Sequence, residues 1–268
     1  MIRRLAREFD TAIGRAAIQL GLVVILLAAW ETGVRSGLVS GFLLGQPSGI
    51  ARNFWRQLAD GALFYDTWVT LYESILGFFI GTVAGSILGL GLWYSRFVAR
   101  TVEPLIVAFN SVPKIAFAPI VILWFGTGLS SKVALAISLT AIVALIAAYQ
   151  AAKDADPDLL SLLLTLGATK NQIFFKVVIP SSLPGIIATF RINVGFGLVG
   201  AVVGEFISSQ RGLGHMIFTA SSFYDLDTVW LGLFTLMGIG FVLYFVIDLI
   251  ERRVLPWKLD PHRAELHV

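Results

Sequence analysis

DADPDLLSLLLTLGATKNQIFFKVVIPSSLP, residues 154–184, separates two long apolar runs with a stretch that is too polar to lie in lipid. Asp156 is followed by a proline, a combination that begins helices, and Gly167 can end a helix in a left-handed conformation. Thr169 with Gln172 three residues later has the spacing of a capping box, which restarts a helix. The segment is therefore predicted to form two short helices that meet at a Gly-Ala corner.

The second of these helices carries an apolar face. Its apolar residues recur at helical spacing, and Pro180 is expected to end the helix because proline has no N–H to donate. The face consists of Ile173, Phe174, Val177 and Val178. An apolar face on a polar loop predicts that the loop docks on a partner.

Composition indicates that most of the chain lies in a bilayer. Apolar residues make up 57% of the sequence and charged residues 14%, against roughly 25% charged residues in soluble domains. Six runs reach the length that a spanning helix needs, and they lack the alternation of a β-barrel. They are residues 13–30, 68–94, 102–125, 133–149, 186–207 and 229–250. The prediction is an all-α, polytopic membrane protein with about six transmembrane helices.

Lysine and arginine residues indicate the orientation of these spans, because they concentrate in cytoplasmic loops. If the N-terminus is cytoplasmic, thirteen of these cations fall on the inner side of the membrane and five on the outer side. Both termini and this loop are therefore expected in the cytoplasm. The same excess accounts for the sequence pI of 9.3, and no basic patch interleaved with aromatic residues predicts nucleic-acid binding.

Glycines recur every four residues within the second predicted span. They place a groove along one face of the helix, into which another helix can pack closely. Packing within the chain is favoured over a dimer seam. The glycines are Gly77, Gly81, Gly85 and Gly89.

The third span contains Pro113 and Pro119, which each remove a backbone donor and predict a kinked or broken helix at mid-membrane. Such backbone is tolerated where protein or a watery cavity satisfies the freed carbonyls. Polar residues beside the break are thus candidates for lining a translocation pathway, although they could instead only repair the kink. The candidates are Asn110, Ser111 and Lys114.

Arg191 and Glu205 are two further candidates for the pathway. In a helix they share roughly one face and lie about 21 Å apart along the axis, too far to pair. Charges within spans usually face a bundle interior or a cavity. The alternatives are that Arg191 reaches the inner headgroups and that Glu205 bonds the loop of residues 208–214, SSQRGLG.

No catalytic or metal site is predicted. The sequence has no cysteine and three histidines without ligand spacing, and it lacks HExxH and GxSxG motifs and a carboxylate pair in the spans. It also lacks the GxxxxGK[ST] loop that holds ATP phosphates. An intramembrane enzyme is therefore disfavoured, and no cofactor is expected on this chain.

Four segments together resemble one family. LGATKNQIFFKVVIPSSLPGI looks like the EAA loop of ABC-importer permeases. FNSVPKIAFAPIVILWFGTGLSSK, GEFISSQRGLGHMI and ERRVLPW resemble the nitrate/sulfonate/taurine-type branch of the binding-protein-dependent transport inner-membrane components. The similarity extends from about residue 45 to residue 258.

The resemblance implies a type I ABC-importer permease of the bacterial inner membrane, with residues 1–268 as one transmembrane domain. The implied partners are a second permease subunit in a homodimer, two ATPase subunits carrying ATP and Mg²⁺, an extracytoplasmic solute-binding protein and membrane lipid. The loop would couple to the ATPase through Leu166, Gly167, Ala168, Lys170, Phe174 and Pro180. One departure is that Ser161, Leu162 and Leu163 replace the Glu-Ala-Ala that names the loop.

The function implied is ATP-driven import of a small solute. Lys114 and the resemblance favour an anion such as nitrate, a sulfonate, taurine or bicarbonate, although similar permeases carry neutral or cationic vitamin precursors. The alternative is an ATP-independent channel or secondary transporter. It would explain the charges within the spans but would leave the patterned loop without a role.

Overall fold

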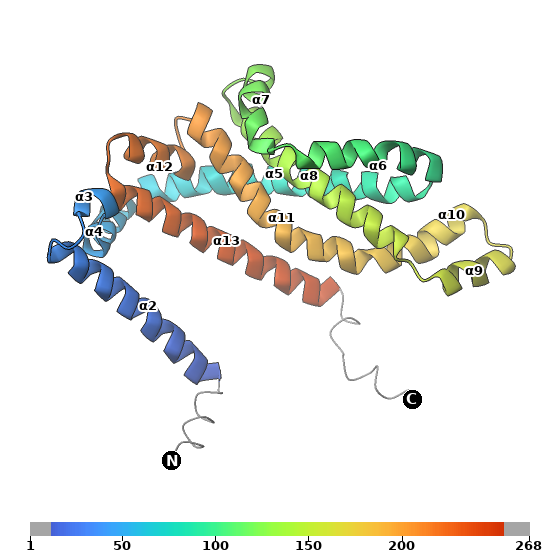
Figure 1. Cartoon of the computed structure of the whole chain (residues 1–268), viewed down its shortest axis with the longest axis horizontal. Helices are drawn as coiled ribbons and strands as arrows, with labels where there is room; N and C mark the ends of the chain where they lie inside the picture. Colours follow the sequence, from blue (N-terminus) through green and yellow to red (C-terminus); the bar gives the residue numbers. More distant parts are fainter. Residues whose placement is uncertain (1–11, 255–268) are drawn as a thin grey trace, which may run out of the picture. The chain divides into compact units, whose positions relative to one another are not determined.

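The computed structural model describes residues 12–254, and all the regular secondary structure in that range is helical (Figure 1). Five helices are long and apolar enough to cross a membrane, and a bent helix pair brings the number to six if it forms one span. The prediction of an all-helical membrane protein with about six spans is confirmed. The predicted cytoplasmic termini and the last three residues of the ERRVLPW motif lie outside the described residues.

The chain divides into two compact units. One contains the residues up to Leu63 together with Met216–Phe234, and the other contains Phe64–His215 together with the residues from Thr235 onward. The boundaries fall inside three helices. These are α5 (Ala62–Trp93), α12 (Leu213–Ser222) and α13 (Leu226–Val254).

In the first unit, α2 (Ala12–Arg35), α3 (Gly41–Leu44) and α4 (Pro47–Ala59) are tied to the start of α13. The indole N–H of Trp230 donates to the carbonyl of Leu44 at 2.8 Å, and the backbone N–H of Gln46 donates to Asp227 Oδ1 at 2.7 Å. The rings of Trp30 and Trp230 meet edge to face at 5.1 Å. These contacts fix the turn between α2 and α4.

In the second unit, α5, α8 (Leu129–Lys153) and α11 (Ile179–Ser208) pack at very short range. A Cβ added at Gly85 of α5 would collide with the carbonyl oxygen of Ala141 on α8. The other three glycines of the same face also meet α8, at Ala136, Thr140 and Leu145. On α11, a Cβ at Gly200 would come within 2.5 Å of the Ala136 backbone. Small residues thus let three helix backbones approach where lipid supplies no hydrophobic drive for association.

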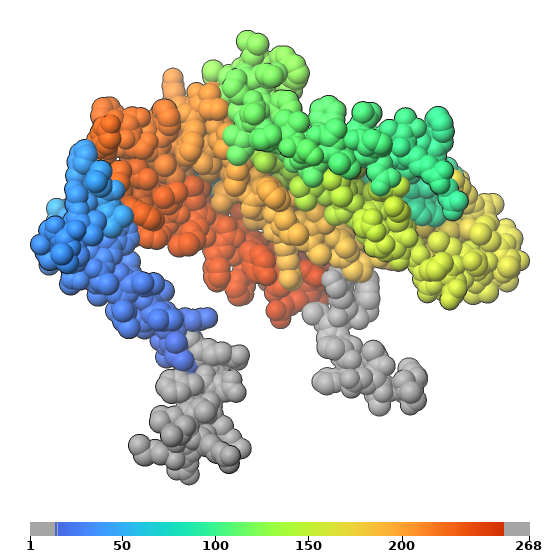
Figure 2. All heavy atoms as spheres, in the orientation of Figure 1, coloured from blue at the N-terminus to red at the C-terminus, as the bar shows by residue number. Residues whose placement is uncertain are grey.

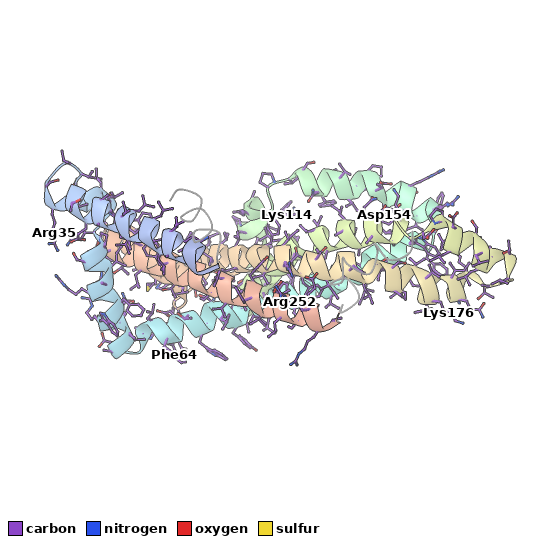
Figure 3. The ribbon with its side chains drawn as sticks, turned by 90° about the horizontal axis from the view of Figure 1, so that it is seen from below. Arg35, Phe64, Lys114, Asp154, Lys176 and Arg252 are labelled. Atoms are coloured by element: carbon purple, nitrogen blue, oxygen red, sulfur yellow. The ribbon has the colours of Figure 1, made fainter. Side chains whose placement is uncertain are left out.

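The third predicted span is broken at Pro113, whereas Pro119 lies in the first turn of the next helix and does not interrupt it. Helix α6 (Arg96–Ser111) ends just before Pro113, a 3₁₀ turn covers Lys114–Phe117, and α7 (Ala118–Phe125) continues at a bend of 86°. Val112 and Pro113 have extended backbone. Figure 3 shows Lys114 at this bend.

Two short helices follow α8, as predicted for the 154–184 loop. They are α9 (Pro157–Thr165) and α10 (Lys170–Ile173), and Asp154 and Lys176 lie on either side of their corner in Figure 3. The prediction that Pro180 ends the second helix is wrong. Helix α10 runs through a π-helical turn (Phe174–Val178) into α11, giving a helical stretch of 39 residues.

The π turn explains how the helix passes this proline. The N–H of Ile179 reaches back five residues to the carbonyl of Phe174, so the chain is widened just before Pro180. The hydroxyls of Ser181 and Ser182 donate to the carbonyls of Val177 and Val178. Hydroxyl donors and a π turn are known ways for a helix to re-satisfy backbone groups that a proline frees.

Candidate functional site

The corner between α9 and α10 is fixed by caps on both helices. The side chain of Asp156 accepts from the N–H of Asp158 at 2.8 Å, which caps the start of α9. At its end Gly167 has φ 76°, and the N–H of Ala168 donates to the carbonyl of Leu163 at 2.9 Å, the pattern of a Schellman motif. Helix α10 then begins with the predicted capping box of Thr169 and Gln172.

Helix α10 turns its apolar face inward. Ile173 and Val178 are buried with Ala152 and Ala155 of the preceding segment, and Phe174 stacks on Trp93 with 5.5 Å between ring centroids. The prediction that this face is free to dock is therefore wrong for Ile173 and Val178. The helical spacing was correct, but spacing alone does not tell which surface an apolar face meets.

Most of the exposed apolar surface of the corner lies on α9 instead. Leu162 is 54% exposed and Leu166 72% exposed, and Figure 2 shows the yellow atoms of α9 and α10 at one end of the second unit. Leu159, Leu164 and Phe175 are exposed as well. The sequence does not reveal this face, because leucines occupy most positions around α9 and the polar Ser161 lies among the exposed leucines.

The predicted coupling residues divide into two groups in the structure. Leu166, Gly167, Lys170 and Pro180 are exposed, whereas Ala168 and Phe174 are half-buried against the chain. Lys170 lies over the ring of Tyr94 and donates to its backbone carbonyl at 2.5 Å. The Tyr94 hydroxyl also bonds Asn171. These contacts hold α10 against the end of α5.

The polar residues beside the broken span bond one another and their own helix. Lys114 Nζ donates to Asn110 Oδ1 at 3.0 Å, and the Ser111 hydroxyl donates to the carbonyl of Val107 at 2.9 Å. Asn110 and Ser111 are exposed, while Lys114 is partly buried. An ammonium has three N–H donors. The Lys114 ammonium therefore has further donors at the bend beyond the one that bonds Asn110.

Glu205 is fully buried and organises the loop that follows α11. Its carboxylate accepts from the Thr70 hydroxyl at 2.7 Å and from the Gly214 N–H at 2.6 Å. Thr70 in turn accepts from the N–H of Leu213 at 2.8 Å. A Cβ at Gly212 would collide with the Glu205 carboxyl. Glu205 thus makes the structural bond to the SSQRGLG loop that the sequence offers as an alternative to lining a pathway.

Arg191 is engaged with the last turns of α13. It forms ion pairs with Asp248 and, at 2.9 Å, with Glu251, and its guanidinium lies over the ring of Tyr244. Asp248 and Glu251 lie near the end of a predicted span, so the sequence indicates that anionic partners are available there for a cation. It does not indicate which cation they pair with. Arg191 is therefore bound within the bundle and does not extend freely to headgroups.

One buried ion pair was not predicted from the sequence. Lys132 Nζ lies 3.4 Å from Glu73 Oε1, and both side chains are almost fully buried. Lys132 directly precedes the predicted span of residues 133–149, so the sequence places it outside the membrane, and Glu73 is not among the residues predicted to have a role. The signal for Glu73 is that Thr70, Glu73 and Ser74 continue the glycine face of α5 with polar residues. That face packs against protein and not lipid.

Asn193 makes a second buried contact among the central helices. Its amide donates to the Thr82 hydroxyl at 2.9 Å and to the carbonyl of Thr140 at 3.0 Å, joining α11 to α5 and α8. Across the described residues 12–254, no group of three or more His, Cys, Asp or Glu side chains is placed to hold a metal ion. The Asn193 amide thus links three helices of the bundle.

The family described as the binding-protein-dependent transport system inner membrane component matches residues 81–256, about two thirds of the chain. This chain belongs to that family. It is a permease subunit of an ABC importer and a multi-pass membrane protein.

Relatives of this permease cover nearly its whole length. The riboflavin transport system permease RibX of Chloroflexus aurantiacus is 34% identical, over 89% of this chain and 90% of the relative. The formylaminopyrimidine transport permease ThiX of Halalkalibacterium halodurans is 32% identical, over 88% and 93%. The taurine transport permease TauC of Escherichia coli is 28% identical, over 91% and 90%.

A solved structure shares the fold of this permease. A chain of the inward-facing MetNI methionine ABC transporter aligns with a TM-score of 0.65 and 23% identity, over 74% of this chain and 98% of that chain. The type I importer permease fold expected from the resemblance is thereby confirmed.

The Lys132–Glu73 pair yields a stability prediction. Lys132→Met leaves the Glu73 carboxylate buried without its partner, and we expect a loss of about 3–5 kcal/mol, with much of it recovered in Lys132→Met/Glu73→Leu. Thermal unfolding of the detergent-purified permease measures both. Arg35→Met is the control, because the Arg35 side chain is 69% exposed in its pair with the partly buried Glu31, and such a pair should contribute at most about 1 kcal/mol. Unchanged stability of Lys132→Met would contradict the buried pairing.

Proposed function

We propose that this permease imports a small solute by alternating access, driven by a separate ATPase that binds the corner formed by residues 154–184. In the active assembly, two copies of the chain surround a central pathway and two ATPase subunits hold ATP and Mg²⁺. A solute-binding protein delivers the solute from outside, and both termini and the corner face the cytoplasm. The family to which the chain belongs and the absence of a P-loop sequence support this division of labour.

The exposed leucine face of α9 is the observation that carries the proposal. Leu159, Leu162 and Leu166 stand at helical spacing and are exposed, on a helix capped at both ends. A short amphipathic helix laid in an apolar groove is a recurring mode of protein recognition. The ATPase groove would therefore receive α9.

The other predicted coupling residues act behind this surface. Gly167 forms the turn, while Lys170 and Phe174 hold α10 against α5 through Tyr94 and Trp93. Pro180 lies just after the π turn that continues α10 into α11. A displacement of α9 is thus passed along one helical stretch into the membrane.

The departure from Glu-Ala-Ala fits an apolar contact. Ser161 and Leu162 are exposed on α9, and Leu163 packs against the cluster around Ile173. We infer that leucines provide, on this chain, the contact that an acidic residue provides in the EAA loop. The partner ATPase would then present an apolar groove with no cation reserved for a glutamate.

Gly167→Val tests the coupling role. Valine at φ 76° is strained although nothing lies within 4 Å of its Cβ, so the corner distorts at a cost of about 1–3 kcal/mol. We expect normal membrane insertion, with solute uptake and substrate-stimulated ATP hydrolysis reduced at least about tenfold. Gly61→Val is the control, because Gly61 has φ 73° and equally open surroundings but lies outside the corner.

Two results would count against this assignment. One is unchanged substrate-stimulated hydrolysis in Gly167→Val, and the other is an equal loss in Gly61→Val. Uptake by the purified permease without any ATPase would favour the alternative of an ATP-independent channel or secondary transporter.

We further propose that Asn110, Ser111 and Lys114 line the pathway at the broken span and that the solute is a small anion. Irregular backbone at membrane depth is tolerated where it lines a cavity, and intramembrane cations mark ion and substrate routes. A relative named for taurine supports a sulfonate-like anion. Relatives named for riboflavin and formylaminopyrimidine support a larger heterocyclic solute instead.

Uptake by Lys114 variants separates these solutes. If the solute is an anion, Lys114→Ala should lower uptake of the transported compound at least about tenfold, the effect of roughly 1.4 kcal/mol, and Lys114→Arg should retain most of it. Transport of labelled taurine, an alkanesulfonate and riboflavin into proteoliposomes containing the whole importer measures this. Full uptake by Lys114→Ala would remove Lys114 from the pathway. Uptake of riboflavin, without uptake of taurine or the alkanesulfonate, would overturn the proposal that the solute is an anion.

A further inference from the structure

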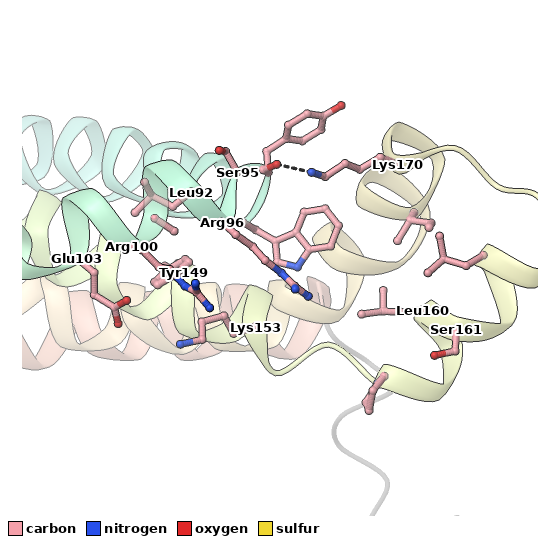
Figure 4. A pocket seen from close by; sticks show the side chains of 16 residues that line it. Leu92, Ser95, Arg96, Arg100, Glu103, Tyr149, Lys153, Leu160, Ser161 and Lys170 are labelled. Carbon is pink, nitrogen blue, oxygen red and sulfur yellow. Dashed lines mark hydrogen bonds between the residues drawn. The ribbon is translucent and has the colours of Figure 1, made fainter.

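A cavity of about 1020 Å³ opens at the end of the second unit that carries the corner. It is lined by the start of α6, the end of α8, helix α9 and the start of α10 (Figure 4). Two lining residues, Lys170 and Tyr94, hold α10 against α5, and no role described above uses the other cations of the lining. Most of the charged side chains that line the cavity are cationic, as Figure 4 shows.

Four cations and a single carboxylate line the cavity. The cations are Arg96 and Arg100 on α6, Lys153 at the end of α8 and Lys170, and the carboxylate is Glu103. No ion pair between any of these four cations and a carboxylate is found among residues 12–254. Figure 4 shows Arg96, Arg100 and Lys153 directing their charged ends into the space between α6 and α8. Among the described residues, the lining of the cavity therefore has three more cations than carboxylates.

The start of α6 adds to this charge. A helix N-terminus carries a partial positive charge and favours acidic side chains or bound anions nearby. The first turn of α6 contains no acidic residue and begins with Arg96, and Arg100 follows one turn later. The Ser95 side chain caps this turn by accepting from the N–H of Val98, and the two arginines make the start of α6 favourable for a bound anion.

The surroundings place the cavity at the membrane boundary. Trp93 ends α5, the partly exposed ring of Tyr94 follows, and both rings are of the kind that sits at headgroup level. Phe97 is 80% exposed beside Arg96, as expected for a side chain facing lipid tails. A headgroup can thus reach the cations while its acyl chains lie along α6.

We propose that this cavity binds the phosphate group of an anionic phospholipid headgroup. Arg96 and Arg100 provide planar donors suited to two phosphate oxygens each, and Lys153 adds a point charge. Basic pockets between membrane helices on the cytoplasmic side are suited to such lipids. Because Lys170 and Leu160 also line the cavity, the bound lipid would brace the α9–α10 corner against α6.

The test compares lipid binding by the full-length permease and two double variants. Arg96→Gln/Arg100→Gln should lower the affinity for phosphatidylglycerol at least about tenfold, from a contribution near 1 kcal/mol per cation. Arg52→Gln/Arg56→Gln is the matched control, because these arginines have the same spacing on α4 and are also exposed. Native mass spectrometry of the protein titrated with phosphatidylglycerol or with phosphatidylcholine measures the bound lipid.

Further arms distinguish the source of the phosphate and guard against misfolding. Arg96→Lys/Arg100→Lys should retain most of the binding, which a role in folding alone would not require, and Lys153→Gln gives an independent single variant. The proposal would be overturned if the α4 control lost as much phosphatidylglycerol binding as Arg96→Gln/Arg100→Gln. It would also be overturned if the wild-type protein bound phosphatidylcholine as tightly as phosphatidylglycerol. If inorganic phosphate stabilised the wild-type protein as much as phosphatidylglycerol does, the proposal of a lipid ligand would be overturned. The cavity would then be assigned to a soluble phosphate compound.

Discussion

The close approach of α5, α8 and α11 is the constraint on which the rest of the structure depends. A bilayer offers no hydrophobic drive between helices, so packing and internal polar contacts must hold them together. Glycines at four successive turns of α5 bring its backbone against α8, and Gly200 does the same for α11. With the three backbones this near, short polar side chains such as Asn193 and Thr82 can reach across. The Lys132–Glu73 pair and the Glu205 contacts extend the same interface toward the end of α11.

This packed unit gives the corner of residues 154–184 a firm base. The buried side chains of α10 attach it to the ends of α5 and α8, and the π turn makes it continuous with α11. The apolar residues that α9 leaves exposed are held on a rigid corner and not on a slack loop. A push on α9 therefore has a direct mechanical route into the helix that carries Asn193 and Glu205.

The sequence predicted the fold where a local rule applied, and it failed where a partner had to be identified. The six apolar runs, the break at Pro113, the capping box at Thr169 and the left-handed Gly167 each follow from a residue and its neighbours. The inward face of α10 depends on where α8 ends in space, which spacing does not specify. The passage of a helix through Pro180 depends on a widened turn, and no residue pattern requires it.

The buried charges show the same limit. Arg191 and Glu205 were recognised as charges within spans, but their partners lie on other elements and are distant in sequence. A lysine at the end of a predicted span, such as Lys132, usually reaches water, whereas here small residues bring Glu73 within its reach. A polar and glycine-rich stripe along one helix is the pattern that points to such a buried partner.

The central claim is that the exposed face of α9 contacts a separate ATPase, and site-directed crosslinking tests it most directly. The chain contains no cysteine, so Leu162→Cys carries a single photocrosslinker, with Leu105→Cys on α6 as a control of similar exposure. In native membranes, we expect an ATPase adduct from Leu162→Cys and none from Leu105→Cys. The yield of the adduct should change with the nucleotide that is bound. Adducts of Leu162→Cys with lipid or with its own chain only, or its labelling by a reagent confined to the cell exterior, would contradict the account.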